Sequence, residues 1–218
     1  MGCSRHDLTA YLWHEGCPRS PYGCWRGDRV YVIASGPSLT EEDARKARQA
    51  QGRVIAVNCS VRLCPDADAL YAGDHKWWAH YRDDWQGFRG LKFSINAQAA
   101  DEFGVIHVER EKGDLGKLGV SASNNSGHQA VNLAYLLGAS SIVMLGFDMK
   151  SSGRANHWHR DHTGTGMTNP NKRNFRDWSE AFTRMHEKLQ AEGVDLWNAT
   201  RDTALTIPER SLEDCLTD

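Results

Sequence analysis

The sequence predicts an α/β protein, a single domain in which a mostly parallel sheet is flanked by helices. Short apolar runs alternate with helical segments along most of the chain, which is the pattern of βαβ units. The run at 30–34 is continuously apolar, as expected of a strand that is buried on both faces. The 218 residues fit one such domain, which we expect at 28–218 behind an N-terminal arm at 1–27.

The first strand ends at a turn that opens into a helix. Gly36 and Pro37 break the apolar run, and Ser38 followed by Glu41 has the spacing of a capping box, so a helix should begin near Leu39 and end before Gly52. Backbone N–H groups at such a start are unpaired and, with the helix dipole, favour an anion such as phosphate. The alternative is a turn with no ligand. The candidate phosphate-binding residues are Ser35, Gly36, Pro37 and Ser38.

Four more short strands are expected before residue 110, at 53–57, 67–72, 91–95 and 105–108. Asn58 follows the first of these strands, and Asp74 follows the second. A helical segment after Asp74 carries four aromatic residues on one face, which is more typical of a core than of a ligand platform. These aromatic residues are Trp77, Trp78, Tyr81 and Trp85.

The second half of the chain has a clearer pattern. Ser126 and Gly127 open a helix whose apolar positions 130, 133, 134 and 137 share one face, and Gly138 closes it. A buried strand at 140–145 then leads into Gly146-Phe147-Asp148. After a polar loop, a long amphipathic helix and a last strand at 194–197 complete the pattern. The apolar stripe of that helix consists of Phe175, Trp178, Phe182, Met185 and Leu189.

Alternating strands and helices of this kind predict a Rossmann-like sheet with right-handed crossovers. Ligands of such sheets bind beyond the carboxyl ends of the strands. We therefore expect the turn at 35–38, Asn58, Asp74 and Asp148 to lie along one edge of the sheet.

The loop after Asp148 spans about 25 residues, a length that indicates a functional role in a compact domain. It contains His157, His159, Asp161 and His162, and the pattern His-x-His-x-Asp-His is also the zinc-ligand signature of the metallo-β-lactamase superfamily. That fold places the motif early, after an antiparallel unit, whereas here it follows a βαβ pattern. A smaller metal site on these residues stays open. The other interpretation is one histidine acting as a general base, with the others orienting it or contacting phosphate.

Composition excludes some classes of protein. A net charge of −2 and a pI of about 6.5 do not favour a protein that mainly binds nucleic acid by charge. No apolar run reaches the length of a membrane span, and no secretory leader is evident, so we expect a cytoplasmic protein with reduced cysteines. Cys3, His6, Cys17 and Cys24 could hold a zinc ion, although their spacing matches no regular finger pattern.

The order of these motifs resembles that of the bacterial lipooligosaccharide sialyltransferases. It equally resembles that of a wider family, which includes the archaeal-type 6-hydroxymethylpterin diphosphokinases and many phage proteins. The resemblance covers roughly residues 29–200. It implies a nucleotide-sugar donor bound without an essential metal, with Gly36, Pro37 and Ser38 against the nucleotide phosphate and Asn58 near the ribose or base. It also implies that Ser126 and Gly127 lie at the base or the phosphate, and that a histidine in the loop after Asp148 deprotonates the acceptor hydroxyl.

Our assignment of the catalytic residues follows from these points. We predict His162 as the general base because it lies nearest to the motif that follows, and we group His157, His159 and Asp148 with it. Electrostatic stabilisation of the leaving phosphate requires a cation nearby. The candidates for that cation are Arg154, Arg160, Lys172 and Arg173.

The expected function is that of a glycosyltransferase, with no cofactor required besides its nucleotide-sugar donor. CMP is one candidate for the nucleotide of that donor. A divalent metal and a homo-oligomer are both compatible with the sequence. The acceptor could be a saccharide or, in a phage protein, a hydroxymethylated DNA base. One alternative is a diphosphokinase that uses ATP and magnesium, with Asp74 and Asp148 as metal ligands. The others are a metal-dependent hydrolase built on the histidine loop and a nucleotide-binding module without catalysis.

Overall fold

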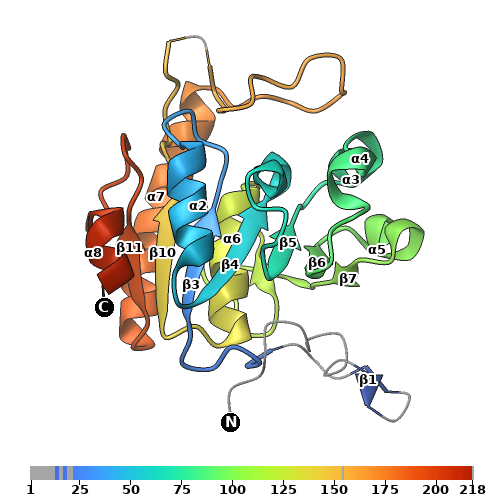
Figure 1. Cartoon of the computed structure of the whole chain (residues 1–218), viewed down its shortest axis with the longest axis horizontal. Helices are drawn as coiled ribbons and strands as arrows, with labels where there is room; N and C mark the ends of the chain where they lie inside the picture. The colour runs from blue at the N-terminus through green and yellow to red at the C-terminus, as the bar shows by residue number, and fades with distance from the viewer. Residues whose placement is uncertain (1–12, 15–16, 19–21, 154, 218) are drawn as a thin grey trace.

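The structure is a computed structural model that describes residues 13–14, 17–18, 22–153 and 155–217. A seven-stranded sheet in the order β11-β10-β3-β4-β5-β6-β7 forms its centre (Figure 1), and every pair of neighbouring strands in it is parallel. The prediction of an α/β fold is thus confirmed, with a sheet that is wholly parallel. The strands are β3 (Arg29–Ile33), β4 (Arg53–Val57), β5 (Ala69–Tyr71), β6 (Leu91–Ser94), β7 (Ile106–His107), β10 (Ser141–Leu145) and β11 (Asp195–Asn198).

Helices cover both faces of this sheet. The first face packs against α2 (Glu41–Gln49), α3 (His75–His80), α4 (Arg82–Trp85), α5 (Ala97–Phe103) and α8 (Leu212–Thr217). The opposite face packs against α6 (Ser126–Leu137) and α7 (Lys172–Ala191). Smaller elements are the 3₁₀ helix η1 (Asn58–Arg62) and two two-stranded ribbons, β1 (Trp13–His14) with β2 (Cys17–Pro18) and β8 (Arg110–Glu111) with β9 (Val120–Ser121).

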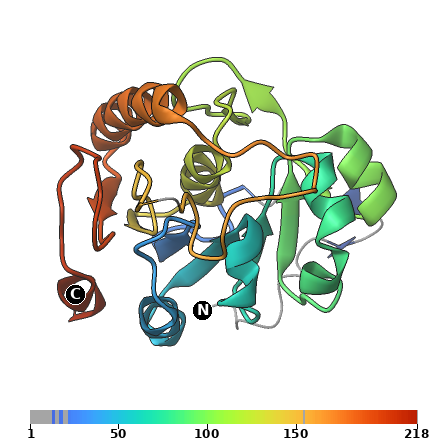
Figure 2. The same cartoon turned by 90° about the horizontal axis from the view of Figure 1, so that it is seen from above.

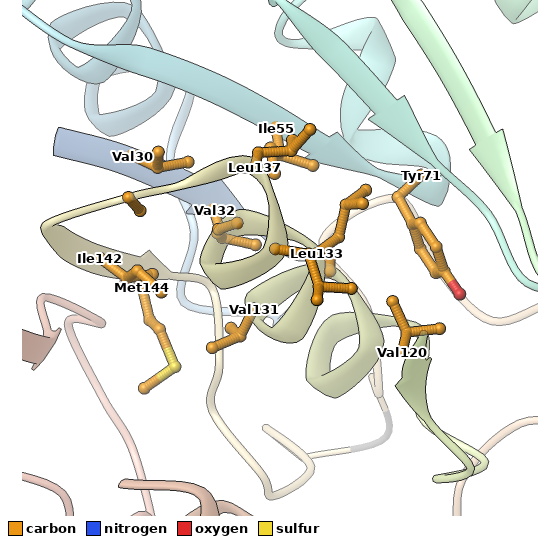
Figure 3. Packing of buried hydrophobic residues seen from close by; sticks show 14 of the residues in the cluster. Val30, Val32, Ile55, Tyr71, Val120, Val131, Leu133, Leu137, Ile142 and Met144 are labelled. Atoms are coloured by element: carbon orange, nitrogen blue, oxygen red, sulfur yellow. The ribbon is translucent and has the colours of Figure 1, made fainter. Parts of the chain in front are cut away.

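Alternation along the strands divides the core into two layers. In β3, Val30 and Val32 point toward α6, whereas Tyr31 and Ile33 belong to the layer under α2. Figure 3 shows the first layer, in which Val30 and Val32 lie near side chains of α6 and β10. Because both faces of β3 are covered, its residues form a continuous apolar run rather than an alternating one.

The sheet reverses its direction of growth between β3 and β10. From β3 the chain adds β4 to β7 on one side, and it then returns to add β10 and β11 on the other side. The loops that leave β3 and β10 therefore diverge at neighbouring carboxyl ends, and such a topological switch point is where open α/β sheets bind ligands.

The start of α2 differs from the prediction. The helix begins at Glu41 and ends at Gln49, and the capping box joins Thr40 to Asp43 rather than Ser38 to Glu41. The Asp43 N–H donates to the Thr40 hydroxyl at 3.1 Å, and the Thr40 N–H donates to the Asp43 carboxylate at 3.3 Å. The predicted box was wrong because Ser38 instead makes a long-range hydrogen bond, described below.

The other elements lie close to their predicted places. The aromatic stripe after Asp74 is mostly core, because Trp77, Trp78 and Trp85 are buried, while Tyr81 is only half-buried. Gly138 ends α6 in the left-handed conformation, with a φ of 104°. Helices α5 and α8 and the 3₁₀ helix η1 were not predicted.

Residues 22–28 pack against the end of α6. The backbone N–H groups of Gly23 and Trp25 donate to the carbonyls of Leu136 and Leu137, and Trp25 is fully buried. Cys24 is half-buried. The predicted metal ligands Cys3 and His6 lie outside the described residues.

In the described part of the chain, no helix combines the length and apolar character that crossing a membrane requires.

Candidate active site

A cavity of about 880 Å³ opens at the carboxyl edge of the sheet, at the switch point between β3 and β10. Its volume lies within the range of small-molecule sites, roughly 300–1,000 Å³. Of the predicted catalytic and nucleotide-binding residues, all but Ser38 and His159 line it. The lining members of that set are Ser35, Gly36, Pro37, Asn58, Asp74, Ser126, Gly127, Asp148, His157 and His162.

Two residues at the cavity adopt an unusual backbone conformation. Asn58 has a φ of 51° and Met149 a φ of 50°, and both line the cavity. Positive φ values at residues other than glycine are uncommon and often mark functional sites. Asn58 follows β4 and Met149 follows the Gly146-Phe147-Asp148 segment, so both lie where a strand ends at the edge that holds the cavity.

The turn at 36–38 is closed onto the segment after β10. The Gly36 N–H donates to the Gly146 carbonyl at 2.8 Å, and the Ser38 N–H donates to the Asp148 carboxylate at 2.9 Å. Gly36 leaves no room for a side chain, since a Cβ there would lie 1.8 Å from Asp148 Oδ1. The prediction that this turn offers unpaired N–H groups to a phosphate is therefore wrong, because a carboxylate of the chain already takes that position.

Asp148 is buried at the base of the cavity, with 2% of its surface exposed. Burial raises the pKa of its carboxyl, against the opposing effect of hydrogen bonding with Ser38. Its Oδ1 atom has no hydrogen-bond partner among the described residues. Asp148 thus joins the two loops of the switch point.

The start of α6 offers the open N–H groups that the first turn lacks. Asn125 caps the helix by accepting from the His128 N–H at 2.9 Å, and within the described residues the N–H groups of Ser126 and Gly127 donate to nothing. Both residues line the cavity. A Cβ on Gly127 would lie 2.8 Å from the Phe147 ring, so glycine permits the close packing of α6 on that ring. An open helix start of this kind favours an anion.

Arg110 is a cation beside this helix start, and sequence reasoning missed it. Its Nη2 donates to the Ala122 carbonyl at 2.8 Å and reaches the Asn124 side chain at 3.5 Å. The structure gives Arg110 no ion pair with a described carboxylate, and its side chain lines the cavity. Of the cations proposed from sequence, Arg160, Lys172 and Arg173 are described but do not line the cavity, and Arg154 is not described.

The loop after Asp148 passes over the cavity. Seen from above, it extends from the start of α7 across to α3 and returns toward the sheet (Figure 2). The Trp158 N–H donates to the Ser35 carbonyl at 3.1 Å, and the Lys76 ammonium donates to the Gly166 carbonyl at 3.0 Å. The loop is therefore attached both to the turn after β3 and to α3.

Three imidazoles of the loop form a compact cluster. The ring centroids of His157, His159 and His162 lie 5.1–5.3 Å apart, and the first two rings are parallel within 2°. Burial lowers the pKa of His157 to about 4 and that of His159 to about 3, and it also lowers the pKa of His162. All three are therefore neutral near pH 7.

The acidic member of the motif is hydrogen-bonded within the loop. Asp161 accepts hydrogen bonds from the Asn156 N–H at 3.0 Å and from the Asn156 side chain at 2.9 Å. In the part of the chain that the structure describes, no group of three or more His, Cys, Asp or Glu side chains is arranged to hold a metal ion. The bonds to Asn156 thus fix Asp161 within the loop.

The start of α7 contributes an apolar wall. Phe175 and Trp178 belong to the stripe predicted as core, but they are half-buried and line the cavity, whereas Phe182 is fully buried. The His128 ring lies 3.4 Å from the Ala181 carbonyl, which sets this part of α7 beside the start of α6. The site thus combines an open helix start, aromatic rings and neutral imidazoles.

The fold and this cavity define an α/β protein with a cavity at a topological switch point. No protein-family model matches the chain. No curated protein matches it either.

Proposed function

We propose that this chain is a glycosyltransferase that transfers a sugar from a nucleotide donor to an acceptor hydroxyl in the cytoplasm. The observation that carries the proposal is the pairing of neutral imidazoles with an open helix start across one cavity. A transfer of this kind needs a base for the acceptor and an anion site for the departing phosphate. The cavity offers His157 and His162 for the first task and the start of α6 for the second.

The donor phosphate is assigned to the N–H groups of Ser126 and Gly127, with Arg110 beside them. Two backbone donors, the helix dipole and a guanidinium stabilise the charge that forms on the phosphate as it departs. This assignment keeps two of the predicted phosphate ligands and replaces the turn at 36–38. The aromatic wall of Phe175 and Trp178 suits the nucleobase, because every base has a face that stacks on aromatic rings.

His162 acts as the general base. In the transfer step the acceptor oxygen bonds to the anomeric carbon while the bond from that carbon to the phosphate oxygen breaks, and the acceptor proton passes to the imidazole. Since the pKa of His162 is lowered, its basic form predominates at neutral pH. The proposed acceptor is a saccharide or, if the protein serves a phage, a hydroxymethylated DNA base.

Thermal shift of metal-stripped protein with CMP, UMP, GDP, ADP and ATP tests the binding part of this proposal. One nucleotide at about a hundred times its Kd should raise the stability by about 2.7 kcal/mol and the Tm by roughly 5–10 °C. Stabilisation by ATP only with magnesium would instead support a diphosphokinase. Stabilisation only by zinc or manganese, with every nucleotide silent, would contradict the proposal and favour a metal-dependent hydrolase.

A further inference from the structure

Tyr81 contacts the proposed base directly, although it lies far from the histidine loop in sequence. Its hydroxyl oxygen lies 2.7 Å from His162 Nδ1, and the two rings lie 5.7 Å apart at an angle of 53°. Tyr81 is the residue at which α3 passes into α4, so a helix junction of the main domain carries the contact. A distance of 2.7 Å is that of a well-formed hydrogen bond.

The tyrosine ring is held in place from several sides. The Arg62 guanidinium lies 5.3 Å from its centroid, and Arg62 is itself fixed by an ion pair of 2.7 Å with Asp84. The Trp77 ring lies 5.8 Å away on the same helix. Because the ring is fixed by groups of the domain and not of the loop, Tyr81 provides a rigid reference for the position of His162.

The nitrogen that Tyr81 takes sets the direction of the hydrogen bond. Burial and the nearby Cys59 thiol raise the pKa of Tyr81, so its hydroxyl keeps its proton at neutral pH. Because Tyr81 lies against Nδ1 of His162, Nε2 is the nitrogen left to act as a base. A basic Nε2 places the ring proton of neutral His162 on Nδ1, and the lone pairs of the hydroxyl oxygen can accept from that N–H.

We propose that Tyr81 is a positioning residue that accepts from His162 Nδ1–H and so leaves Nε2 as the basic nitrogen. The inference rests on the proposed function, in which His162 takes the proton of the acceptor hydroxyl. In that step the proton moves from the acceptor oxygen to Nε2, and the electron pair of the broken bond leaves with the phosphate. The tyrosine oxygen stabilises the positive ring through Nδ1–H, and the proton at Nε2 later passes to water.

Nitrogen-15 NMR of the histidine side chains tests the tautomer without any substrate. In the wild-type protein we expect the proton of neutral His162 on Nδ1, and in Tyr81→Phe we expect a shift toward the Nε2–H form. Tyr135→Phe is the matched control, because Tyr135 donates to Glu192 at 3.1 Å on the surface of α6. A proton on Nε2 in the wild type, or an unchanged tautomer in Tyr81→Phe, would overturn the inference.

Kinetics separate this inference from the function on which it rests. With a nucleotide-sugar that the wild type turns over, Tyr81→Phe should lower kcat about tenfold and leave the KM for the donor unchanged, which corresponds to the loss of one oriented hydrogen bond. Equal kcat values for Tyr81→Phe and Tyr135→Phe would overturn the positioning role. Full activity of His162→Ala would instead remove the proposed base and leave the NMR result as it stands.

Discussion

Replacing Gly36 by alanine probes the joint between the two loops that form the cavity. The added Cβ would lie 1.8 Å from Asp148 Oδ1 and 2.5 Å from the Gly146 carbonyl oxygen. The second contact is with backbone, so no change of rotamer relieves it. The turn after β3 must therefore move away from the segment after β10.

The structure sets the size of the effect. Moving the turn lengthens the hydrogen bond from the Gly36 N–H to Gly146, worth about 1 kcal/mol, and the bond from the Ser38 N–H to the Asp148 carboxyl, worth about 1.5–3 kcal/mol. Overpacking in a filled interior costs about 1–3 kcal/mol in addition. Since these costs overlap, we expect the free energy of unfolding to fall by about 3 kcal/mol and the Tm by roughly 6–12 °C.

Urea denaturation followed by circular dichroism measures this change. Gly87→Ala is the matched control, because nothing lies within 4 Å of a Cβ at Gly87 and neither glycine has a positive φ. The control should stay within about 0.5 kcal/mol of the wild type. If Gly36→Ala were as stable as Gly87→Ala, the close contact of the two loops at the switch point would be refuted.

Three further predictions concern charge and ligand binding. His128 is fully buried with its pKa lowered to about 4, so the folded protein binds fewer protons than the unfolded chain. Stability should therefore fall by about 3 kcal/mol as the pH drops from 6.5 to 4, with a flatter pH profile in urea melts of His128→Gln. Arg110→Ala should weaken the binding of the stabilising nucleotide about tenfold in calorimetry, and this difference from the wild type should be smaller at high salt. An affinity equal to that of the wild type would exclude Arg110 from the phosphate site. Trp178→Ala should lose about 1–3 kcal/mol of nucleotide affinity, whereas Trp197→Ala, on β11, should lose none.

The sequence was sufficient to predict the sheet and the edge that holds the site. The apolar run of β3 indicates burial on both faces, and polar residues after β3, β4, β5 and β10 must share an edge once the strands are parallel. Local sequence patterns did not predict the hydrogen bond that the Ser38 N–H makes. Its N–H is taken by Asp148, a residue 110 positions away, and no local rule reports such a contact.

Helical periodicity also assigned to the core three aromatic residues that are only half-buried. Tyr81 shares a helical face with buried tryptophans, yet its hydroxyl meets His162 in a loop 81 residues later. Phe175 and Trp178 continue the stripe of Phe182, but they lie at the end of α7 that borders the cavity. An aromatic stripe that begins directly after a polar, histidine-rich loop is the signal that could have separated these two residues from the core.

The release of free nucleotide from nucleotide-sugars is the most direct test of the proposed function. Metal-stripped protein with EDTA is incubated with CMP-, UDP-, GDP- and ADP-linked sugars and a mixture of acceptor saccharides or hydroxymethylated DNA, and the freed nucleotide is quantified. We expect turnover of one donor, lowered about 10²–10⁴-fold in His162→Ala and unchanged in His186→Ala, a histidine on α7 outside the cavity. Equal turnover in the wild type and His162→Ala, or no turnover of any donor, would contradict the account.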